Sequence, residues 1–416
     1  MTAGGLVPPG AVDGAPAGGG PAGPERGQPV RAREIGLRVP DRESGLQVRD
    51  RESGLRPRAR EIGLRPGQFA TGALNAITDV DGVLVGQVTR VEGETIRTGV
   101  TAIRPHGGNL FAERVPAGLA VMNGFGKLAG ATQLMELGEL ETPIVLTNTL
   151  AVGRAVEAVV DWTLARNAEA RSVNAVVGET NDGRLNDIRA RGVTGADVLA
   201  ALDGAVVGPV EEGSVGAGTG TMAFGWKGGI GTSSRLLPAA LGGFAIGALV
   251  QSNYGGALVM DGVPVGRELG KFYLREHADQ GDVDGSVMVV IATDAPLSDR
   301  NLQRLALRAM AGLARTGAAF SDGSGDYAIA FSTHAGVRRG AAHRAGDASL
   351  PDWPNDRMSP LFVAAAEAVE EAVLNSMLRA VTVESRDPAT GRRRKGEAID
   401  TAAVRAVVER YRPAQG

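Results

Sequence analysis

The chain of 416 residues contains no cysteine, and this absence excludes disulfides, thiolate metal sites and a cysteine nucleophile. Histidine is also scarce, because the chain has only four: His106, His277, His334 and His343. No segment matches HExxH, GxSxG, a Walker loop or an EF-hand loop. The motifs of histidine-dependent and metal-dependent hydrolases are therefore missing, and neither a metal ion nor a cofactor is expected.

Neither nucleic acid nor a membrane is expected as a partner. The 44 Lys and Arg residues nearly balance the 47 Asp and Glu residues, so the net charge of -3 gives no general attraction to phosphate-rich surfaces. The longest apolar stretch, residues 236–250, is interrupted by Pro238 and three glycines and is shorter than the ~20 residues of a membrane-spanning helix. The first 20 residues lack the basic and apolar regions of a secretory signal, so a cytoplasmic location is expected.

The N-terminal part of the chain has little apolar surface. Residues 1–30 are rich in Gly, Ala and Pro, and residues 32–67 hold four copies of a nine-residue repeat: AREIGLRVP, DRESGLQVR, DRESGLRPR and AREIGLRPG. Each copy offers too few apolar side chains to offset the entropy of ordering the chain. Residues 1–70 are therefore predicted to be a disordered tail, and a docking tag is the alternative interpretation.

From Asn75 onward, short β-type runs and helical patterns alternate with glycine turns. Alternating or continuous apolar residues predict strands, and apolar residues at helical spacing predict helices. The clearest strands are expected within 140–147, 172–180, 244–256, 285–296 and 324–333, and the clearest helices within 151–167, after Ser298 and within 359–381. Mixed strands and helices indicate an α+β or α/β domain.

The glycine-rich segment GAGTGTM (216–222) resembles a nucleotide-binding loop only superficially. It lacks the Lys-Ser/Thr pair of a phosphate loop and no helical pattern with a suitably placed acidic residue follows it. Tight turns with close backbone approach are the structural interpretation. The functional alternative is that its backbone N–H groups contribute to an oxyanion site.

Ser252 follows a run of apolar strand residues in ALVQSNYGG (248–256). A serine in such a place is usually structural, and the local pattern alone does not assign it a role. Seven segments in the same order, however, resemble one family: NAITDVDGVLVGQVT (75–89), GFGKLAGATQLMELGELETPIVLTNT (124–149), VVGETNDGRLND (176–187), GAGTGTMAFGWKGGIGTSSR (216–235), ALVQSNYG (248–255), MVVIATDAPL (288–297) and SGDYAIAFST (324–333). This is the DmpA-type family of L-aminopeptidase D-Ala-esterase/amidases and β-peptidyl aminopeptidases, peptidase family S58.

The resemblance implies an α+β fold, a four-layer αββα sandwich like that of the amino-terminal nucleophile (Ntn) hydrolases but with different connectivity. It also implies a precursor that cuts itself, here between Gln251 and Ser252, into 71–251 and 252–416 as two parts of one catalytic domain. Family members carry Gly or Asn before the nucleophile, whereas this chain has Gln251. The new α-amine of Ser252, with an ordinary pKa of about 7.7–8.0, would serve as the base for its own hydroxyl.

The expected activity is that of a serine aminopeptidase or amidase, which hydrolyses small peptides, amides or esters with a free N-terminal amine through an acyl-enzyme on Ser252. Ser286, Thr293 and Asp294 are the candidates for orienting the nucleophile or relaying its proton. Asn148 and Asn181 are candidate oxyanion donors, with turn residues as the alternative. Glu136 matches a residue that holds the substrate amine, and a solvated helix carboxylate is the alternative.

Lys227 and Arg235 flank the glycine-rich segment and are expected to anchor the fold or the contact between subunits. A homo-oligomer of paired subunits is implied by the family precedent. An acyl transferase related to ornithine acetyltransferases and a non-catalytic binding module remain as alternative functions. The sequence does not decide between L-, D- and β-amino acid substrates, because that choice depends on the shape of the pocket.

Overall fold

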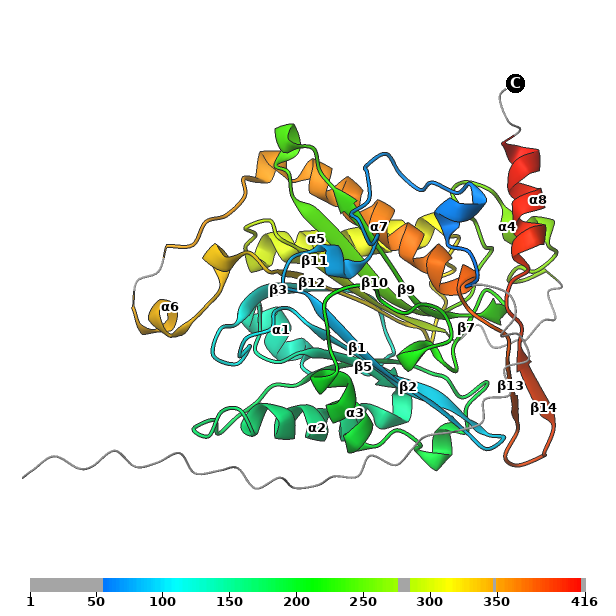
Figure 1. The fold of residues 1–416 in the computed structure, drawn as a ribbon, viewed down its shortest axis with the longest axis horizontal. Helices are drawn as coiled ribbons and strands as arrows, with labels where there is room; N and C mark the ends of the chain where they lie inside the picture. Colours follow the sequence, from blue (N-terminus) through cyan, green and yellow to red (C-terminus); the bar gives the residue numbers. More distant parts are fainter. Residues whose placement is uncertain (1–54, 276–284, 347–348, 413–416) are drawn as a thin grey trace, which may run out of the picture. The chain divides into compact units, whose positions relative to one another are not determined.

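Two β-sheets lie face to face and carry helices on their outer faces (Figure 1). The computed structural model describes residues 55–275, 285–346 and 349–412. The smaller sheet has the order β1-β2-β5-β6 and the larger sheet β4-β3-β12-β11-β10-β9. Within them, only the pairs β5/β6 and β11/β12 are parallel.

The bounds of the elements are as follows. The smaller sheet consists of β1 (Leu84–Glu92), β2 (Ile96–Arg104), β5 (Ile144–Asn148) and β6 (Val176–Thr180). The larger sheet consists of β3 (Val115–Gly124), β4 (Glu139–Leu140), β9 (Gly229–Leu236), β10 (Ala245–Asn253), β11 (Ser286–Thr293) and β12 (Gly325–Ser332). Two short hairpins are formed by β7 (Met222–Ala223) with β8 (Trp226–Lys227) and by β13 (Val383–Arg386) with β14 (Arg393–Gly396).

The α-helices are α1 (Ala131–Leu137), α2 (Val152–Leu164), α3 (Gly195–Asp203), α4 (Val265–Glu268), α5 (Asp299–Arg315), α6 (Ala341–Ala345), α7 (Ser359–Leu378) and α8 (Thr401–Tyr411). Helices α2 and α3 cover the smaller sheet, and α5 and α7 cover the larger one, so the layers follow the order αββα (Figure 1). This arrangement confirms the predicted fold class. Both chain parts on either side of Ser252 contribute strands to the larger sheet.

Three apolar clusters fill the spaces between the layers, because strand residues alternate between the two faces of each sheet. In β10, Leu249 belongs to the cluster between the two sheets, whereas its neighbour Val250 belongs to the cluster under α5 and α7. In β11, Met288 faces the other sheet and Val287 faces the helices. The third cluster lies between the smaller sheet and α2 and α3. The same alternation determines on which face of the sheet a polar side chain at the end of one of these strands lies.

The structure contradicts the expected tail boundary at residue 70. Residues 59–62 form a 3-10 helix, and Ala59 and Ile62 are buried. The backbone N–H of Ala59 donates to Asn375 Oδ1 on α7 at 2.9 Å. The fourth repeat copy is therefore part of the folded domain. The first two copies and residues 50–54 of the third lie outside the described residues.

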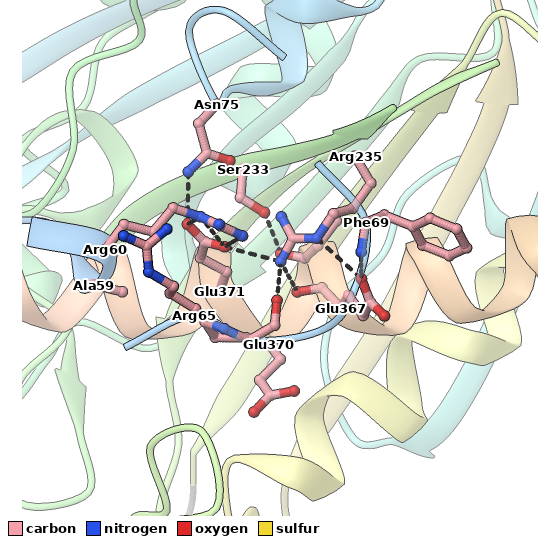
Figure 2. A network of polar contacts seen from close by, with 12 residues as sticks. Ala59, Arg60, Arg65, Phe69, Asn75, Ser233, Arg235, Glu367, Glu370 and Glu371 are labelled. Carbon is pink, nitrogen blue, oxygen red and sulfur yellow. Dashed lines mark hydrogen bonds and ion pairs between the residues drawn. The ribbon is translucent and has the colours of Figure 1, made fainter. Parts of the chain in front are cut away.

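An ion-pair network beneath this segment explains why it is held (Figure 2). Arg60 lies 2.8 Å from Glu371 on α7, and Arg235 on β9 approaches the same carboxylate at 2.8 Å from the other side. Asn75 also donates to Glu371, at 2.6 Å. Arg235 and Glu371 are fully buried, and removing one of them leaves the charge of the other buried without a partner. Arg235 thus anchors the fold, as expected from the sequence.

Candidate active site

A cavity of about 820 Å³ lies where β6 and β10 end and where β11 and β12 begin. The loops around these ends complete its wall. The lining residues that bear on chemistry are Lys127, Thr149, Glu179, Asn181, Arg184, Asn253, Gly285, Ser286, Arg394 and Lys395. None of the lining residues is a histidine. The site therefore offers hydroxyl, amide and carboxylate groups together with cationic side chains.

Ser286 is the first residue of β11 and lies in the cavity wall with 7% of its surface exposed. It is paired with Asn253 on antiparallel β10 and with Gly325 on parallel β12. The backbone N–H of Gly325 donates to Ser286 Oγ at 3.2 Å. This contact holds the hydroxyl oxygen at the cavity.

Asn253 shares a sheet face with Ser286, because directly opposed residues of an antiparallel pair project to the same side. Its Oδ1 accepts a hydrogen bond from the backbone N–H of Met222 at 2.9 Å, which fixes the orientation of the amide. Among the residues that the structure describes, Nδ2 has no hydrogen-bond partner. An oriented N–H group without a partner can donate a hydrogen bond to an oxyanion that forms beside it.

Gly285 precedes Ser286 and also lines the cavity. A Cβ at this position would lie 2.4 Å from the carbonyl oxygen of Asn253 and 2.4 Å from Cα of Tyr254. Backbone atoms at that distance leave room only for glycine. The Gly285–Ser286 peptide bond is thus held against the end of β10, beside the amide of Asn253.

A buried carboxyl lies next to Ser286 on the neighbouring strand. Asp326 pairs with Val287 across β11 and β12, and its oxygens accept hydrogen bonds from Ser324 Oγ at 2.6 Å and Asn123 Nδ2 at 2.9 Å. Burial raises the pKa of Asp326, and the two hydrogen bonds oppose that rise. Asp326 does not line the cavity, but it adjoins Gly325, whose backbone N–H donates to Ser286 Oγ.

Glu179 provides the negative charge of the cavity. Its carboxylate accepts hydrogen bonds from the backbone N–H of Lys127 at 2.9 Å and from Thr149 Oγ1, and only 3% of the residue is exposed. No cation is ion-paired with it within residues 55–275, 285–346 and 349–412. A buried carboxylate without a cationic partner is well suited to bind a substrate ammonium group.

Ser252 does not line the cavity. Ser252 is fully buried, and its Oγ lies 2.7 Å from Ser376 Oγ on α7 and accepts from the backbone N–H of Gly229 at 3.1 Å. Because it alternates with Asn253 along β10, it faces the helices rather than the other sheet. A nucleophile must reach its substrate, so this geometry does not support the predicted role of Ser252.

The position of Gln251 also does not support the predicted cut between Gln251 and Ser252. It pairs with Met288 on one side and Ile230 on the other, within the continuous ladders of β10. Its side-chain nitrogen also donates to groups of the other sheet, among them Thr180 Oγ1 at 2.8 Å. A break here would open a strand that is paired on both edges.

Asp294 and Thr293 lie at the wrong end of β11. The strand runs from Ser286 to Thr293, so at ~3.3 Å per residue Asp294 is about 25 Å from Ser286. Asp294 Oδ1 accepts from the backbone N–H of Ala245 at 2.8 Å, and Thr293 Oγ1 donates to the Ala245 carbonyl at 2.9 Å. Both residues form hydrogen bonds with Ala245 at the start of β10, far from the cavity, so neither is placed to relay a proton there.

The other predicted residues divide between the cavity and the scaffold. Asn148 is buried, accepts from the backbone N–H of Ala151 at 3.0 Å and donates to Thr98, so it is a turn residue. Asn181 lines the cavity and stays a candidate donor. Glu136 is exposed on α1 and does not line the cavity, which fits the alternative of a solvated carboxylate.

Lys227 and Asp182 are both buried and interact electrostatically. Lys227 Nζ donates to the carbonyls of Gly218 and Gly228 at 2.7 and 2.8 Å, which ties the glycine-rich segment to the hairpin β7/β8. Burial raises the pKa of Asp182 to about 6 and lowers that of Lys227 to about 7. The segment 216–218 is thus a structural turn, as its glycines suggest.

Sequence reasoning missed Glu179, Asn253 and Asp326, and it gave Ser286 only a supporting role. One signal was present: Gly285 precedes Ser286, and the resembled family carries Gly or Asn before its nucleophile, whereas Gln251 precedes Ser252. Glu179 and Asn253 also stand at the ends of apolar strands, where cavities form in layered folds.

Comparison with known proteins decides the family. The sequence model of peptidase family S58 matches residues 75–390. The chain belongs to this family. The β-peptidyl aminopeptidase BapA of Sphingosinicella microcystinivorans is 40% identical over 364 residues, which cover 82% of this chain and 89% of the relative.

Solved structures of this S58 peptidase's relatives agree with its fold. A protein of Pyrococcus horikoshii OT3 has a TM-score of 0.78 and 44% identity, with 85% of this chain and 99% of that chain covered. The L-aminopeptidase D-Ala-esterase/amidase of Ochrobactrum anthropi has a TM-score of 0.76 and 40% identity, with 85% and 99% covered. The latter is described as a prototype serine aminopeptidase with a variant of the Ntn hydrolase fold.

This S58 peptidase is therefore a hydrolase of the aminopeptidase class, as the sequence predicts. In the part of the chain that the structure describes, no group of three or more His, Asp or Glu side chains is arranged to hold a metal ion. None of the described helices is long and apolar enough to cross a membrane.

Proposed function

We propose that the protein is a self-cleaving serine aminopeptidase whose nucleophile is Ser286, and that it hydrolyses small peptides, amides or esters with a free N-terminal amine. The observation that carries the proposal is the position of Ser286 in the cavity. Its hydroxyl lies beside the Gly285–Ser286 peptide bond, opposite the amide of Asn253 and in the same cavity as Glu179. These groups supply a nucleophile, an oxyanion donor and an ammonium site.

Self-cleavage would begin with the attack of Ser286 Oγ on the carbonyl carbon of Gly285. The C–N bond between the two residues breaks, the acyl group passes to oxygen, and the hydroxyl proton passes to nitrogen. Water then hydrolyses this ester and leaves a carboxylate on Gly285 and a free α-amine on Ser286. The products are fragments 1–285 and 286–416.

In the mature enzyme the α-amine of Ser286 takes the proton of its own hydroxyl, so no histidine is needed. Oγ attacks the substrate carbonyl while Asn253 Nδ2 donates to the developing oxyanion. The leaving amine takes the proton, and water releases the acyl group from Ser286. Because the amine must be unprotonated, activity should fall as the pH drops below its ordinary pKa of about 7.7–8.0.

Glu179 would hold the free amine of the substrate and thereby restrict the enzyme to unblocked N-termini. Its two hydrogen bonds, from Lys127 N and Thr149 Oγ1, fix the carboxylate without neutralising it. A charge-assisted hydrogen bond to an ammonium group is strong in such a buried place. Blocking the amine by acetylation removes that interaction.

The test compares Ser286→Ala with the wild type and with Ser298→Ala, a serine outside the cavity at the start of α5. Denaturing gels should show two fragments for the wild type and Ser298→Ala and one chain for Ser286→Ala. Only the two cut proteins should release p-nitroaniline from L-Ala-p-nitroanilide, and none should act on its N-acetyl derivative. A Ser286→Ala protein that is cut and active contradicts the proposal.

The alternative functions give different results in the same assay. Transfer of the acyl group to an added amine in preference to water would indicate an acyl transferase. A wild-type protein that stays uncut and inactive would indicate a binding module. Light scattering of the cut enzyme would test the further proposal that pairs of fragments assemble into a homo-oligomer.

A further inference from the structure

The side chain of Gln251 crosses from the larger sheet to the smaller one close to the cavity. Its Nε2 lies 2.8 Å from Thr180 Oγ1 on β6, 3.1 Å from the Thr147 carbonyl on β5 and 3.0 Å from the Ala217 carbonyl. Gln251 is fully buried, and its Oε1 has no hydrogen-bond partner among the described residues. Burying a polar oxygen without a hydrogen-bond partner lowers the free energy of unfolding. The presence of Gln251 at this position therefore suggests a role for the contacts that its Nε2 makes.

Two of the three residues that Gln251 contacts lie next to, or close in sequence to, the residues of the proposed ammonium site. Thr180 directly follows Glu179, and Thr147 lies two residues before Thr149, whose hydroxyl donates to Glu179. On its own strand, Gln251 lies two residues before Asn253 and on the same face. One side chain therefore links the strands that carry the ammonium site to the strand that faces Ser286.

A second contact fixes the same spacing between the sheets. Gly178 immediately precedes Glu179, and a Cβ on it would lie 2.5 Å from Cε of Met288, which follows Ser286 by two residues. The two sheets are therefore in direct contact beside the cavity. Among the described residues, only Gln251 adds hydrogen bonds between strands of the two sheets to that packing, so it acts as a tether between the sheets.

This spacing has a chemical consequence that rests on the proposed function. If Glu179 binds the substrate amine and Ser286 attacks the carbonyl, the distance between the two sheets must match the distance from amine to carbonyl. One carbon separates these groups in an α-amino acid and two in a β-amino acid. We propose that Gln251 is a positioning residue that sets this distance and thereby the preference between α- and β-aminoacyl substrates.

The experiment measures the ratio of kcat/KM for β-Ala-p-nitroanilide to that for L-Ala-p-nitroanilide. Gln251→Met keeps the volume but removes the tether, so the sheets separate and the ratio should shift toward the β-substrate. Gln251→Asn keeps the amide on a shorter side chain and should shift the ratio toward the α-substrate. Since a misplacement of about 1 Å can cost roughly a hundredfold in rate, a change of at least about tenfold is expected.

Ser233→Ala is the matched control. Ser233 is buried on neighbouring β9 and donates to the Ala368 carbonyl on α7 at 2.6 Å, so its loss weakens the fold on the helix side alone. The ratio in this control should stay within about twofold of the wild type, since no contact between the sheets changes. Met288→Val alters the same spacing without removing a hydrogen bond and serves if the Gln251 variants do not fold.

The proposal is overturned if folded, cut variants keep the wild-type ratio, shift it in the opposite sense, or shift it no more than Ser233→Ala does. Such a result leaves the proposed function intact, because the enzyme still cuts itself and hydrolyses the substrates. Failure of the proposed function is seen separately, as a Ser286→Ala protein that is cut and active.

Discussion

Replacing Ser252 by alanine distinguishes the role of Ser252 from that of Ser286, because the structure indicates that Ser252 only stabilises the fold. Its Oγ lies 2.7 Å from Ser376 Oγ and accepts from the backbone N–H of Gly229 at 3.1 Å, and the residue is fully buried. Ser376 keeps its other hydrogen bond, to the Val373 carbonyl at 2.7 Å. Ser252 Oγ also lies 3.3 Å from the Gly229 carbonyl oxygen, so Ser252→Ala removes these contacts without leaving the Ser376 hydroxyl wholly unpaired.

The expected cost follows from these contacts. A buried hydrogen bond contributes about 0.5–1.5 kcal/mol net, so the free energy of unfolding should fall by about 2 kcal/mol. Self-cleavage and kcat/KM should stay within about twofold of the wild type, because no group that lines the cavity changes and the Ser252 side chain lies on the opposite face of β10 from that of Asn253.

Urea unfolding followed through the three tryptophans measures the stability, and gels and p-nitroanilide hydrolysis measure the rest. The wild type and Ser286→Ala frame the comparison, since Ser286→Ala should lose cleavage and activity while it keeps most of its stability. A folded Ser252→Ala protein that is uncut and inactive would refute this reasoning and restore Ser252 as the nucleophile.

Three further predictions follow from individual side chains. Glu179→Gln should raise KM for L-Ala-p-nitroanilide by at least about tenfold, because it removes a charge-assisted bond to the amine, and an unchanged KM would exclude Glu179 as the ammonium site. Burial raises the pKa of Asp182 from 3.8 to about 6, so its folded form holds a proton that the unfolded form releases, and wild-type stability falls as the pH rises from about 4 to about 6. Asp182→Asn should lack this fall, a difference of up to about 3 kcal/mol in urea unfolding at pH 4 and 7, and parallel pH profiles would contradict it. Ala59→Asp should lower the free energy of unfolding by about 3–5 kcal/mol, because it buries a carboxylate near Glu371, and an unchanged urea midpoint would show that the segment is not held on α7.

Much of the fold follows from local patterns. The apolar run at 244–256 and the helical spacing at 359–381 predict β10 and α7 within a few residues. The reason is that the spacing of apolar residues along the chain reflects which faces of a strand or helix are buried. The order of the layers came instead from the resemblance of seven segments to a known family. Local patterns do not specify which strands of two sheets lie side by side.

In the sequence, the choice between the two serines is indicated only by the residue that precedes each of them, Gly285 or Gln251, and the fold supplies the rest. Ser252 and Ser286 both adjoin apolar strand residues, but they differ in the sheet face on which they lie. Ser252 is bonded to Ser376, which is 124 positions away along the chain, and Ser286 meets the cavity beside Asn253. Only the pairing of strands and helices reveals that difference.

The folded part of the repeat tail was missed for a similar reason. The fourth copy has the same sparse apolar composition as the others, yet Arg60 is bound to Glu371, 311 positions away. Asp294 was proposed as a partner of Ser252, but the antiparallel pairing of β10 with β11 places it at Ala245, at the other end of β10. Long-range contacts decide each of these cases.

The N-terminal sequence and intact mass of the smaller fragment test the central claim most directly. A cut at Gly285–Ser286 gives a chain that begins Ser-Val-Met-Val and spans 286–416, and this is the predicted result. A chain that begins Ser-Asn-Tyr-Gly and spans 252–416, or an uncut and active enzyme, would contradict it.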